Sequence, residues 1–288
     1  MRFQRIEKKT ARSGKNYYPF PLLPMPELAE VAFACGKWNP GIGKFIIEIY
    51  ANPSSRVYRD LLPKDVVSEL TKAKLTSSAT HGKQMLFKLS GDKWLGIHLG
   101  MTGSLHINSS NHQNHKHDAL ILYQPNQALV FKDPRQFGRL RLHTGKTPPS
   151  WWSELPTSML DPKFKLSVLS NALSRHGKRP VKALLLDQRY FQGMGNWMAD
   201  EVLWRSGIHP GRLGSKINTA ECANLFSQIK FVVRGAMKSV GKHGGDPPKG
   251  WLFHVRWKNG GICPKTQSPL KREDIGGRTS CWCPKIQK

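Results

Sequence analysis

One segment decides how the second half of the chain folds: Asp187-Gln188-Arg189-Tyr190-Phe191-Gln192-Gly193-Met194-Gly195-Asn196. It joins two stretches in which apolar residues recur with helical spacing, 181–186 and 197–206. Its paired glycines suit an irregular turn in which backbone amides can approach a phosphate. The sequence therefore predicts two helices joined by a turn that can bind an anion.

Helical spacing continues on both sides of this segment, over 165–173 and 219–240, and Thr147-Pro148-Pro149-Ser150 is typical of a linker. Upstream of the linker a short helix is predicted over 27–37. The region from there to about residue 145 alternates short apolar segments with turn residues, which predicts a β-sandwich or barrel. The expected strands are 45–50, 85–89, 94–99, 119–123, 128–131 and 140–142.

The composition restricts the class of partner. Lysine and arginine outnumber aspartate and glutamate by 45 to 19 in the 288 residues, a formal charge of +26. Residues 1–24 carry little of this excess, so the folded part is basic and nucleic acid is the expected partner, ahead of a membrane surface. No apolar run is long enough to cross a membrane, and residues 1–24 lack the apolar core of a secretory signal. Five cysteines, an odd number, favour a reducing compartment.

The stretch Met25-Pro26-Glu27-Leu28-Ala29-Glu30 is the candidate for covalent chemistry. Removal of Met25 would expose a secondary amine whose reference pKa, about 8, leaves far more neutral nucleophile than a lysine. Attack of that amine on a sugar C1′ gives an iminium ion, and Glu27 is then placed to carry protons. On these residues alone, an ordinary proline at a helix start explains the pattern equally well.

Four separated stretches resemble the formamidopyrimidine-DNA glycosylase / endonuclease VIII family of base-excision repair enzymes, over roughly residues 25–288. They occur in the family's order across 180 residues, which makes the resemblance strong. Ala29 stands where a second proline is common. The four stretches are Pro26-Glu27-Leu28-Ala29-Glu30-Val31, His98-Leu99-Gly100-Met101-Thr102-Gly103-Ser104-Leu105, Asp133-Pro134-Arg135-Gln136-Phe137-Gly138, and Leu184 through Pro210, which is similar to the helix–two-turns–helix element.

The resemblance implies the roles of the catalytic residues. Pro26 is the nucleophile, Glu27 the acid and base that helps to open the deoxyribose, and Glu30 a second acidic residue near the site. Lys83 matches a β-hairpin lysine that neutralises a phosphate beside the lesion. Without the family, Glu30 and Lys83 would be read as ordinary solvated charges.

The resemblance also implies DNA contacts. Met101, Arg135 and Phe137 match the residues that fill the gap left by an everted base, which offsets an unstacking cost of a few kcal/mol. Their identities favour oxidised purines as substrates. His98, at the start of the first β signature, and Asn196, which would otherwise be read as a helix cap, are further DNA-binding positions. Arg278, in Gly276-Gly277-Arg278, matches the finger arginine that binds a lesion-flanking phosphate.

The carboxyl end keeps the register of the family's four-cysteine zinc finger but loses half of its ligands. Cys263 and Cys283 remain, whereas Thr266 and Ile286 occupy the other two ligand positions. Two thiolates do not make a closed tetrahedral zinc site. We therefore expect no metal and no other cofactor, and a zincless finger held by packing, with Trp282 and Trp257 as candidates.

These observations predict an α+β protein with a β-sandwich and a helical domain. The expected division is a basic extension over 1–24, a catalytic β-sandwich over 25–146, a linker over 147–164, a helix–two-turns–helix domain over 165–250 and a finger over 251–288. The expected function is a bifunctional DNA glycosylase and abasic-site lyase. It would act as a monomer on double-stranded DNA with oxidised bases or abasic sites.

Three alternatives stay open at this point. The first is a glycosylase for oxidised pyrimidines, the second is a protein that binds damaged DNA without catalysis, and the third is a basic RNA- or ribosome-associated protein. The expected location is the cytoplasm or nucleoid of a prokaryote, or the nucleus or an organelle of a eukaryote, and not outside the cell. As long as Pro26 lies inside the chain its nitrogen is an amide, so catalysis requires translation from Met25 followed by its removal, or cleavage of the leader.

Overall fold

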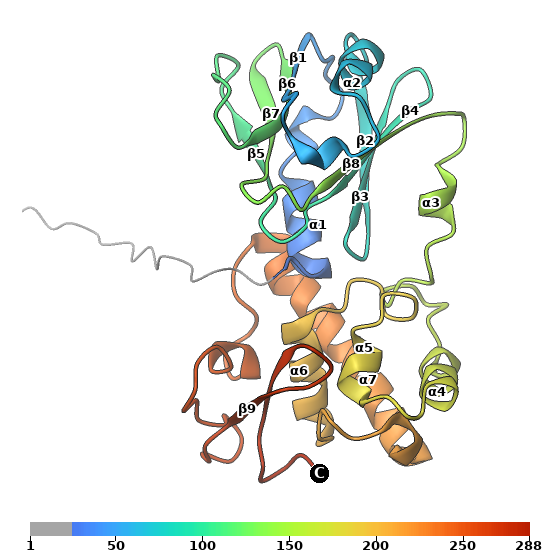
Figure 1. Cartoon of the computed structure of the whole chain (residues 1–288), viewed down its shortest axis with the longest axis vertical. Helices are drawn as coiled ribbons and strands as arrows, with labels where there is room; N and C mark the ends of the chain where they lie inside the picture. The colour runs from blue at the N-terminus through green and yellow to red at the C-terminus, as the bar shows by residue number, and fades with distance from the viewer. Residues whose placement is uncertain (1–24) are drawn as a thin grey trace, which may run out of the picture.

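The computed structural model describes residues 25–288 and consists of a β-rich half and a helical half (Figure 1). The β-rich half contains two four-stranded sheets, and the helical half carries a small two-stranded hairpin at its carboxyl end. The predicted α+β class, a β-sandwich followed by a helical domain, is confirmed. The prediction for residues 1–24 falls outside the described residues. Among the helices of residues 25–288, none has the length and apolarity needed to span a bilayer.

The two sheets are antiparallel and enclose an apolar core between them. Phe87 and Leu95 of one sheet and Leu120 and Phe131 of the other are completely buried in this core. The first sheet has the order β1 (Glu48–Ala51), β6 (Asp118–Gln124), β7 (Gln127–Lys132), β5 (Ser104–Asn108), and the second has the order β2 (Leu75–His81), β3 (Gln84–Leu89), β4 (Lys93–His98), β8 (Arg139–Thr144).

The structure corrects several predictions in this half. The strand expected over 45–50 is confined to Glu48–Ala51, and Phe45 makes only an isolated bridge to Lys74. Two strands, β2 and β5, and the helix α2 (Pro63–Leu70) were not predicted. β2 was not predicted because its sequence, Leu-Thr-Ser-Ser-Ala-Thr-His, has almost no alternation of apolar residues. It is an edge strand, so pairing with β3, rather than its own pattern, makes it a strand.

In the helical half all four predicted helices are present. They are α4 (Leu166–Arg175), α5 (Val181–Leu185), α6 (Asn196–Ser206) and α7 (Thr219–Ala236), which continues into a π-helical turn, η4 (Met237–Gly241). The stretch expected to be a linker contains one further helical turn, α3 (Ser150–Ser153). The core of this half is centred on Trp197, Phe191 and Leu225, all fully buried.

Helix α1 (Leu28–Gly36) belongs to both halves at once. Its first residues, Leu28 and Ala29, pack into the core of the helical half. The following turns place Val31, Ala34 and Cys35 in the core of the β-rich half. The amino-terminal end of α1, with the predicted catalytic residues, is therefore held where the two halves meet (Figure 1).

The carboxyl-terminal hairpin, β9 (Lys271–Asp274) and β10 (Thr279–Trp282), packs against α6 through its own small apolar cluster. Trp282 packs edge-on to His209, with 4.2 Å between ring centroids. The expectation for Trp257 is wrong: that side chain is 37% exposed, and Trp204 of α6 occupies the cluster instead. The cluster consists of Trp204, Leu252, Cys263, Leu270, Cys281 and Cys283, with Val255 and Ile286 against it.

Candidate functional site

The carboxylate of Glu27 is anchored on the first turn of α6. Its Oε1 accepts a hydrogen bond from the backbone N–H of Trp197 at 2.8 Å, and its Oε2 accepts one from Met198 at 3.1 Å. A free helix amino terminus supplies such donors and favours negative charge. Gly195, the residue before the helix, leaves room for this approach, because a Cβ there would overlap the Glu27 carboxyl group.

The buried Glu27 and the partly buried Glu30 form an acidic pair. The indole Nε1–H of Trp197 donates to Oε1 of Glu30 at 2.9 Å, and the backbone N–H of Glu27 donates to Oε2 of Glu30 at 3.2 Å. Burial, reinforced by the Glu30 charge, raises the pKa of Glu27 to about 8, although Lys83 and the two backbone donors oppose the shift. Burial also raises the pKa of Glu30. A carboxyl group with a pKa near neutrality can both donate and accept a proton at physiological pH.

Lys83 lies in the tight turn between β2 and β3, which rests on the glycine-containing segment. Its Nζ donates to the carbonyl oxygen of Met194 at 3.1 Å. Burial lowers its pKa and the charge of Arg278 adds to this, whereas the nearby Glu27 and Glu30 raise it. Gly82 has a φ of +58° and no room for a side chain, since a Cβ would lie 2.9 Å from the backbone of Gly193.

Pro26 precedes this cluster by one residue and is half-buried. The backbone N–H of Leu28 donates to the carbonyl oxygen of Gly193 at 3.0 Å, which ties the start of α1 to the segment 187–196. The fold therefore brings together predicted residues from three distant parts of the chain: Pro26 with Glu27, Lys83, and the start of α6.

Asn196 is the first residue of α6 and not its cap, which is Gly195. Its Nδ2 donates to the carbonyl oxygen of Thr279 at 2.9 Å, on the strand that follows Arg278. Within the part of the chain that the structure describes, its buried Oδ1 has no hydrogen-bond partner. The Asn196 side chain therefore connects α6 directly to the finger hairpin.

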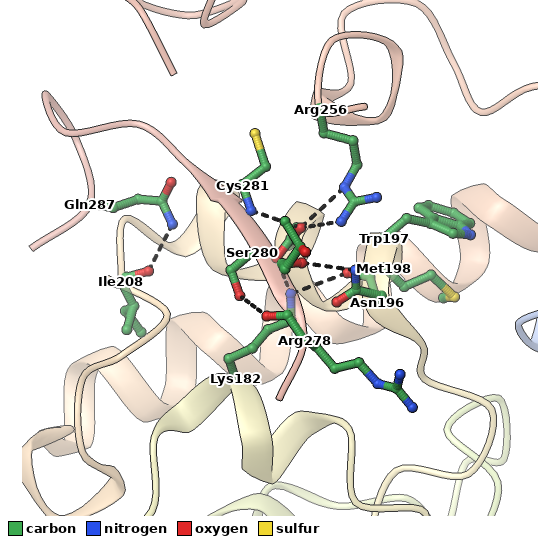
Figure 2. Close-up of polar contacts among 12 residues, drawn as sticks. Lys182, Asn196, Trp197, Met198, Ile208, Arg256, Arg278, Ser280, Cys281 and Gln287 are labelled. Carbon is green, nitrogen blue, oxygen red and sulfur yellow. Dashed lines mark hydrogen bonds and ion pairs between the residues drawn. The ribbon is translucent and has the colours of Figure 1, made fainter. Parts of the chain in front are cut away.

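Arg278 follows the turn of that hairpin. Gly276 and Gly277 have φ values of +63° and +75°, a left-handed conformation that glycine adopts without strain. The guanidinium of Arg278 extends away from the surrounding hydrogen-bonded groups in Figure 2. Arg278 immediately precedes Thr279, whose carbonyl oxygen accepts from Asn196, and its charge contributes to lowering the pKa of Lys83. Such a group of donors suits a phosphate.

A buried ionic cluster beneath these residues fixes the hairpin on α6. The carboxylate of Asp200 contacts Lys182 and Arg256, and its Oδ2 accepts from the backbone N–H of Cys281 at 3.1 Å (Figure 2). Nζ of Lys182 also donates to the Asn196 carbonyl oxygen at 3.4 Å. Sequence reasoning missed this cluster; the only signal was a set of charged residues inside apolar segments.

Met101 lies in the loop between β4 and β5, and Arg135 and Phe137 lie in the adjoining loop between β7 and β8. The Arg135 guanidinium stacks on the Phe137 ring, with 4.9 Å to its centroid, and Phe137 is 43% exposed. The buried Asp133 joins the loops, since its carboxylate accepts from the Thr102 hydroxyl at 3.1 Å and from the Gly138 N–H at 2.7 Å. The three residues form a second group, separate from the one around Glu27.

His98 ends β4 beside these loops. Its Nδ1 accepts from the Gly100 N–H at 3.0 Å, so Nε2 carries the proton of the neutral ring. Burial, with the charges of Lys83 and Arg141, lowers the pKa of His98 to about 4. The imidazole is therefore neutral near pH 7 and offers a hydrogen-bond donor without a charge.

The residues at the family's zinc positions do not fit a zinc ion. The hydroxyls of Thr266 and Ser268 each lie 3.4 Å from the Cys283 thiol, and Ile286 packs against the apolar cluster. The Trp204 indole N–H donates to the Cys263 sulfur at 3.4 Å. In residues 25–288 no group of three or more metal-ligating side chains is present. The two thiols therefore contact hydroxyl and indole groups, and the fourth ligand position is aliphatic.

Two family models of known proteins match separate parts of the chain. Residues 25–140 match the formamidopyrimidine-DNA glycosylase N-terminal domain, and residues 155–245 match the H2TH domain of the same enzymes. The formamidopyrimidine-DNA glycosylase of Psychromonas ingrahamii is 31% identical over 91% of this chain and 100% of its own length.

Two solved structures share the fold. The Lactococcus lactis Fpg (MutM), bound to DNA with an oxidised pyrimidine, has a TM-score of 0.83 at 24% identity and covers 91% of this chain and 100% of its own. A MutM in complex with carbocyclic 8-oxo-G-containing DNA has a TM-score of 0.81 at 25% identity, with the same coverage of both chains.

Proposed function

Because the chain belongs to the formamidopyrimidine-DNA glycosylase family and is a DNA repair glycosylase, we propose that it is bifunctional and also cleaves the strand as an abasic-site lyase. The observation that supports this most directly is the position of Pro26. It lies one residue from Glu27, whose buried carboxyl group has a pKa of about 8. That carboxyl group accepts a hydrogen bond from the start of α6, the helix whose first residue is Asn196.

In the proposed reaction, the amine of a terminal Pro26 attacks C1′ of the damaged nucleotide. The C1′–base bond breaks, the base leaves with a proton, and the ring oxygen takes another when the sugar opens to the iminium ion. Glu27, with Glu30 hydrogen-bonded to its backbone, supplies and removes these protons. Loss of the C2′ proton and of the 3′ phosphate, followed by loss of the C4′ proton and of the 5′ phosphate, completes β- and δ-elimination.

Lys83, Asn196 and Arg278 would bind the phosphate beside the lesion. Asn196 begins α6, where the backbone also favours an anion; Lys83 contacts Met194 just before it, and Arg278 precedes Thr279, which Asn196 contacts. Met101, Arg135 and Phe137 would fill the gap left by the everted nucleotide, and stacking of Arg135 on Phe137 would make them act as one wedge. We propose a monomer acting on duplex DNA in a reducing compartment that contains DNA.

The substrate is expected to be an oxidised purine. Chains translated from Met25 should nick duplexes with 8-oxoguanine opposite cytosine much faster than duplexes with 5-hydroxyuracil, because Met101, Arg135 and Phe137 match the purine-specific pattern. Single-turnover rates on both duplexes, and on undamaged duplex, measure the preference. Faster nicking of the oxidised pyrimidine would assign the chain to the endonuclease VIII type, and equal binding of all three without nicking would support a non-catalytic protein.

The pure protein should contain no stoichiometric zinc. Thr266 and Ile286 cannot complete a tetrahedral site, so the finger is held by the cluster around Trp204. Metal analysis by mass spectrometry is expected to give far less than one zinc per chain. A chelator should leave both the melting temperature and the affinity for abasic-site duplex unchanged, whereas a zinc finger loses its fold without metal. One tightly bound zinc per chain would contradict this interpretation.

A further inference from the structure

The outer face of the second sheet carries a basic pocket that has no role in the proposed chemistry. Register places Gln84, His98 and Arg139 in one row across β3, β4 and β8, and Arg141 lies two residues further along β8. Alternate residues of the same strands, such as Met85, point into the core. The pocket has a volume of about 280 Å³ and is lined by these four side chains with Arg59 and Phe137.

Two features shape the pocket. Gly96 lies directly opposite Arg141 in the sheet and leaves a hollow, into which the Trp151 ring packs so closely that a Cβ would lie 2.5 Å away. The Arg141 guanidinium stacks on Trp151, with 4.7 Å to the ring centroid, and is thereby oriented. Arg59 has a φ of +55° and a ψ of −111°, a strained conformation for a residue with a side chain. Strain of this kind collects at functional sites.

The charges in the pocket are largely uncompensated. Over residues 25–288, the only carboxylate paired with its three arginines is Asp60, whose side chain is 99% exposed and lies 4.0 Å from Arg139. Burial lowers the pKa of Arg141, and the charge of the neighbouring Arg139 adds to this shift. Gln84 and the neutral His98 add donors without charge. A pocket this rich in donors and poor in acceptors suits an anion.

We propose that this pocket binds a phosphodiester group of the DNA strand opposite the lesion. Planar guanidiniums match phosphate oxygens in pairs, which explains three arginines in one small pocket. Three arginines around one small pocket of about 280 Å³ suit a compact anion such as a single phosphate group. The strand follows from Phe137, which lines the pocket and belongs to the wedge expected to face the orphaned base. The inference rests on the proposed mode of DNA binding.

Salt dependence of binding tests the proposal with a duplex that holds an uncleavable abasic-site analogue. Each phosphate contact contributes about 0.9 to the slope of log affinity against log salt. The double variant Arg139→Gln, Arg141→Gln should therefore lose about one unit of slope and, near physiological salt, roughly tenfold in affinity. The matched control, Lys64→Gln with Lys146→Gln, removes the same charge from exposed residues and should change neither.

A scan with single neutral methylphosphonates, made on the unaltered protein, locates the contact without any variant. We expect a position in the strand opposite the lesion at which the substitution weakens binding, and no effect of that substitution in the double variant. An equal slope for variant and parent, or sensitivity confined to the lesion strand, overturns the proposal. Failure of the parent protein to nick DNA would instead contradict the glycosylase/lyase assignment. The salt-dependence slope is measured without cleavage, so it still tests the phosphate pocket.

Discussion

A chain that begins at Pro26 is expected to become covalently trapped on abasic-site DNA by borohydride, whereas the 288-residue chain that begins at Met1 is not. Borohydride reduces an iminium ion to a stable amine, so trapping reports the Schiff base itself. An amide nitrogen has no available lone pair, and Pro26 becomes an amine only when it is the first residue. The expected difference is close to all or none, because no binding interaction substitutes for the nucleophile.

Electrophoresis and mass spectrometry of the trapped species measure this result. The adduct should map to Pro26, and acetylation of the amino terminus should abolish it. Both forms should still bind the abasic duplex, since Lys83, Asn196 and Arg278 are unchanged. Trapping of the 288-residue chain at Lys83 or another lysine would contradict the assignment of Pro26. Failure of the Pro26 chain to be trapped, despite tight binding, would leave a damaged-DNA binder.

The strands and helices with strong apolar patterns were predictable from the sequence. β3, β4, β6 and β7 are buried on the core face and read as apolar runs, and the four main helices keep their 3.6-residue spacing. β2 was missed because an edge strand with polar residues on both faces carries no such signal. Its position nevertheless matters, since the turn after it carries Lys83.

The candidate site was predictable as a set of residues but not as an arrangement. The resemblance to the family singled out Pro26, Glu27 and Asn196, yet nothing local indicates that the Glu27 carboxylate lies on a helix start 170 residues away. The Asp200 cluster and the arginine pocket were missed for the same reason. Each forms by pairing between strands or helices that are distant in the chain, which single-sequence periodicity cannot detect.

The sequence shows that Thr266 and Ile286 stand at two of the family's four cysteine positions, but it does not show how the finger packs. Which aromatic residue joins the apolar cluster depends on how the finger docks on α6, and it is Trp204, not the predicted Trp257. The ion pair between Arg256 and Asp200 adds a second attachment of the finger to that helix.

Replacing Glu27 by Gln is expected to slow base excision by roughly 10²- to 10⁴-fold, the usual contribution of general acid–base catalysis. The change Glu27→Gln keeps the shape and one acceptor for the Trp197 N–H but removes the ionisable proton. Measured on a Pro26 chain, trapping on a preformed abasic site should persist, because the amine and the phosphate contacts remain. Single-turnover excision of 8-oxoguanine, compared with trapping on abasic DNA, separates the two steps; equal loss of both would indicate misfolding.

The Glu27→Gln variant is also expected to change how the free energy of unfolding depends on pH. The pKa of Glu27 in the folded chain, about 8, lies above its ordinary value of 4.5, so its contribution to stability is complete below pH 4.5 and is lost as pH rises to 8. The slope is at most about 1.4 kcal/mol per pH unit. Between pH 5 and 8 the free energy of unfolding should therefore fall more steeply in the parent than in Glu27→Gln. If protonated Glu27 is the acid, excision by the parent should also decline as pH passes about 8, and a variant with the same decline would assign the proton to another group.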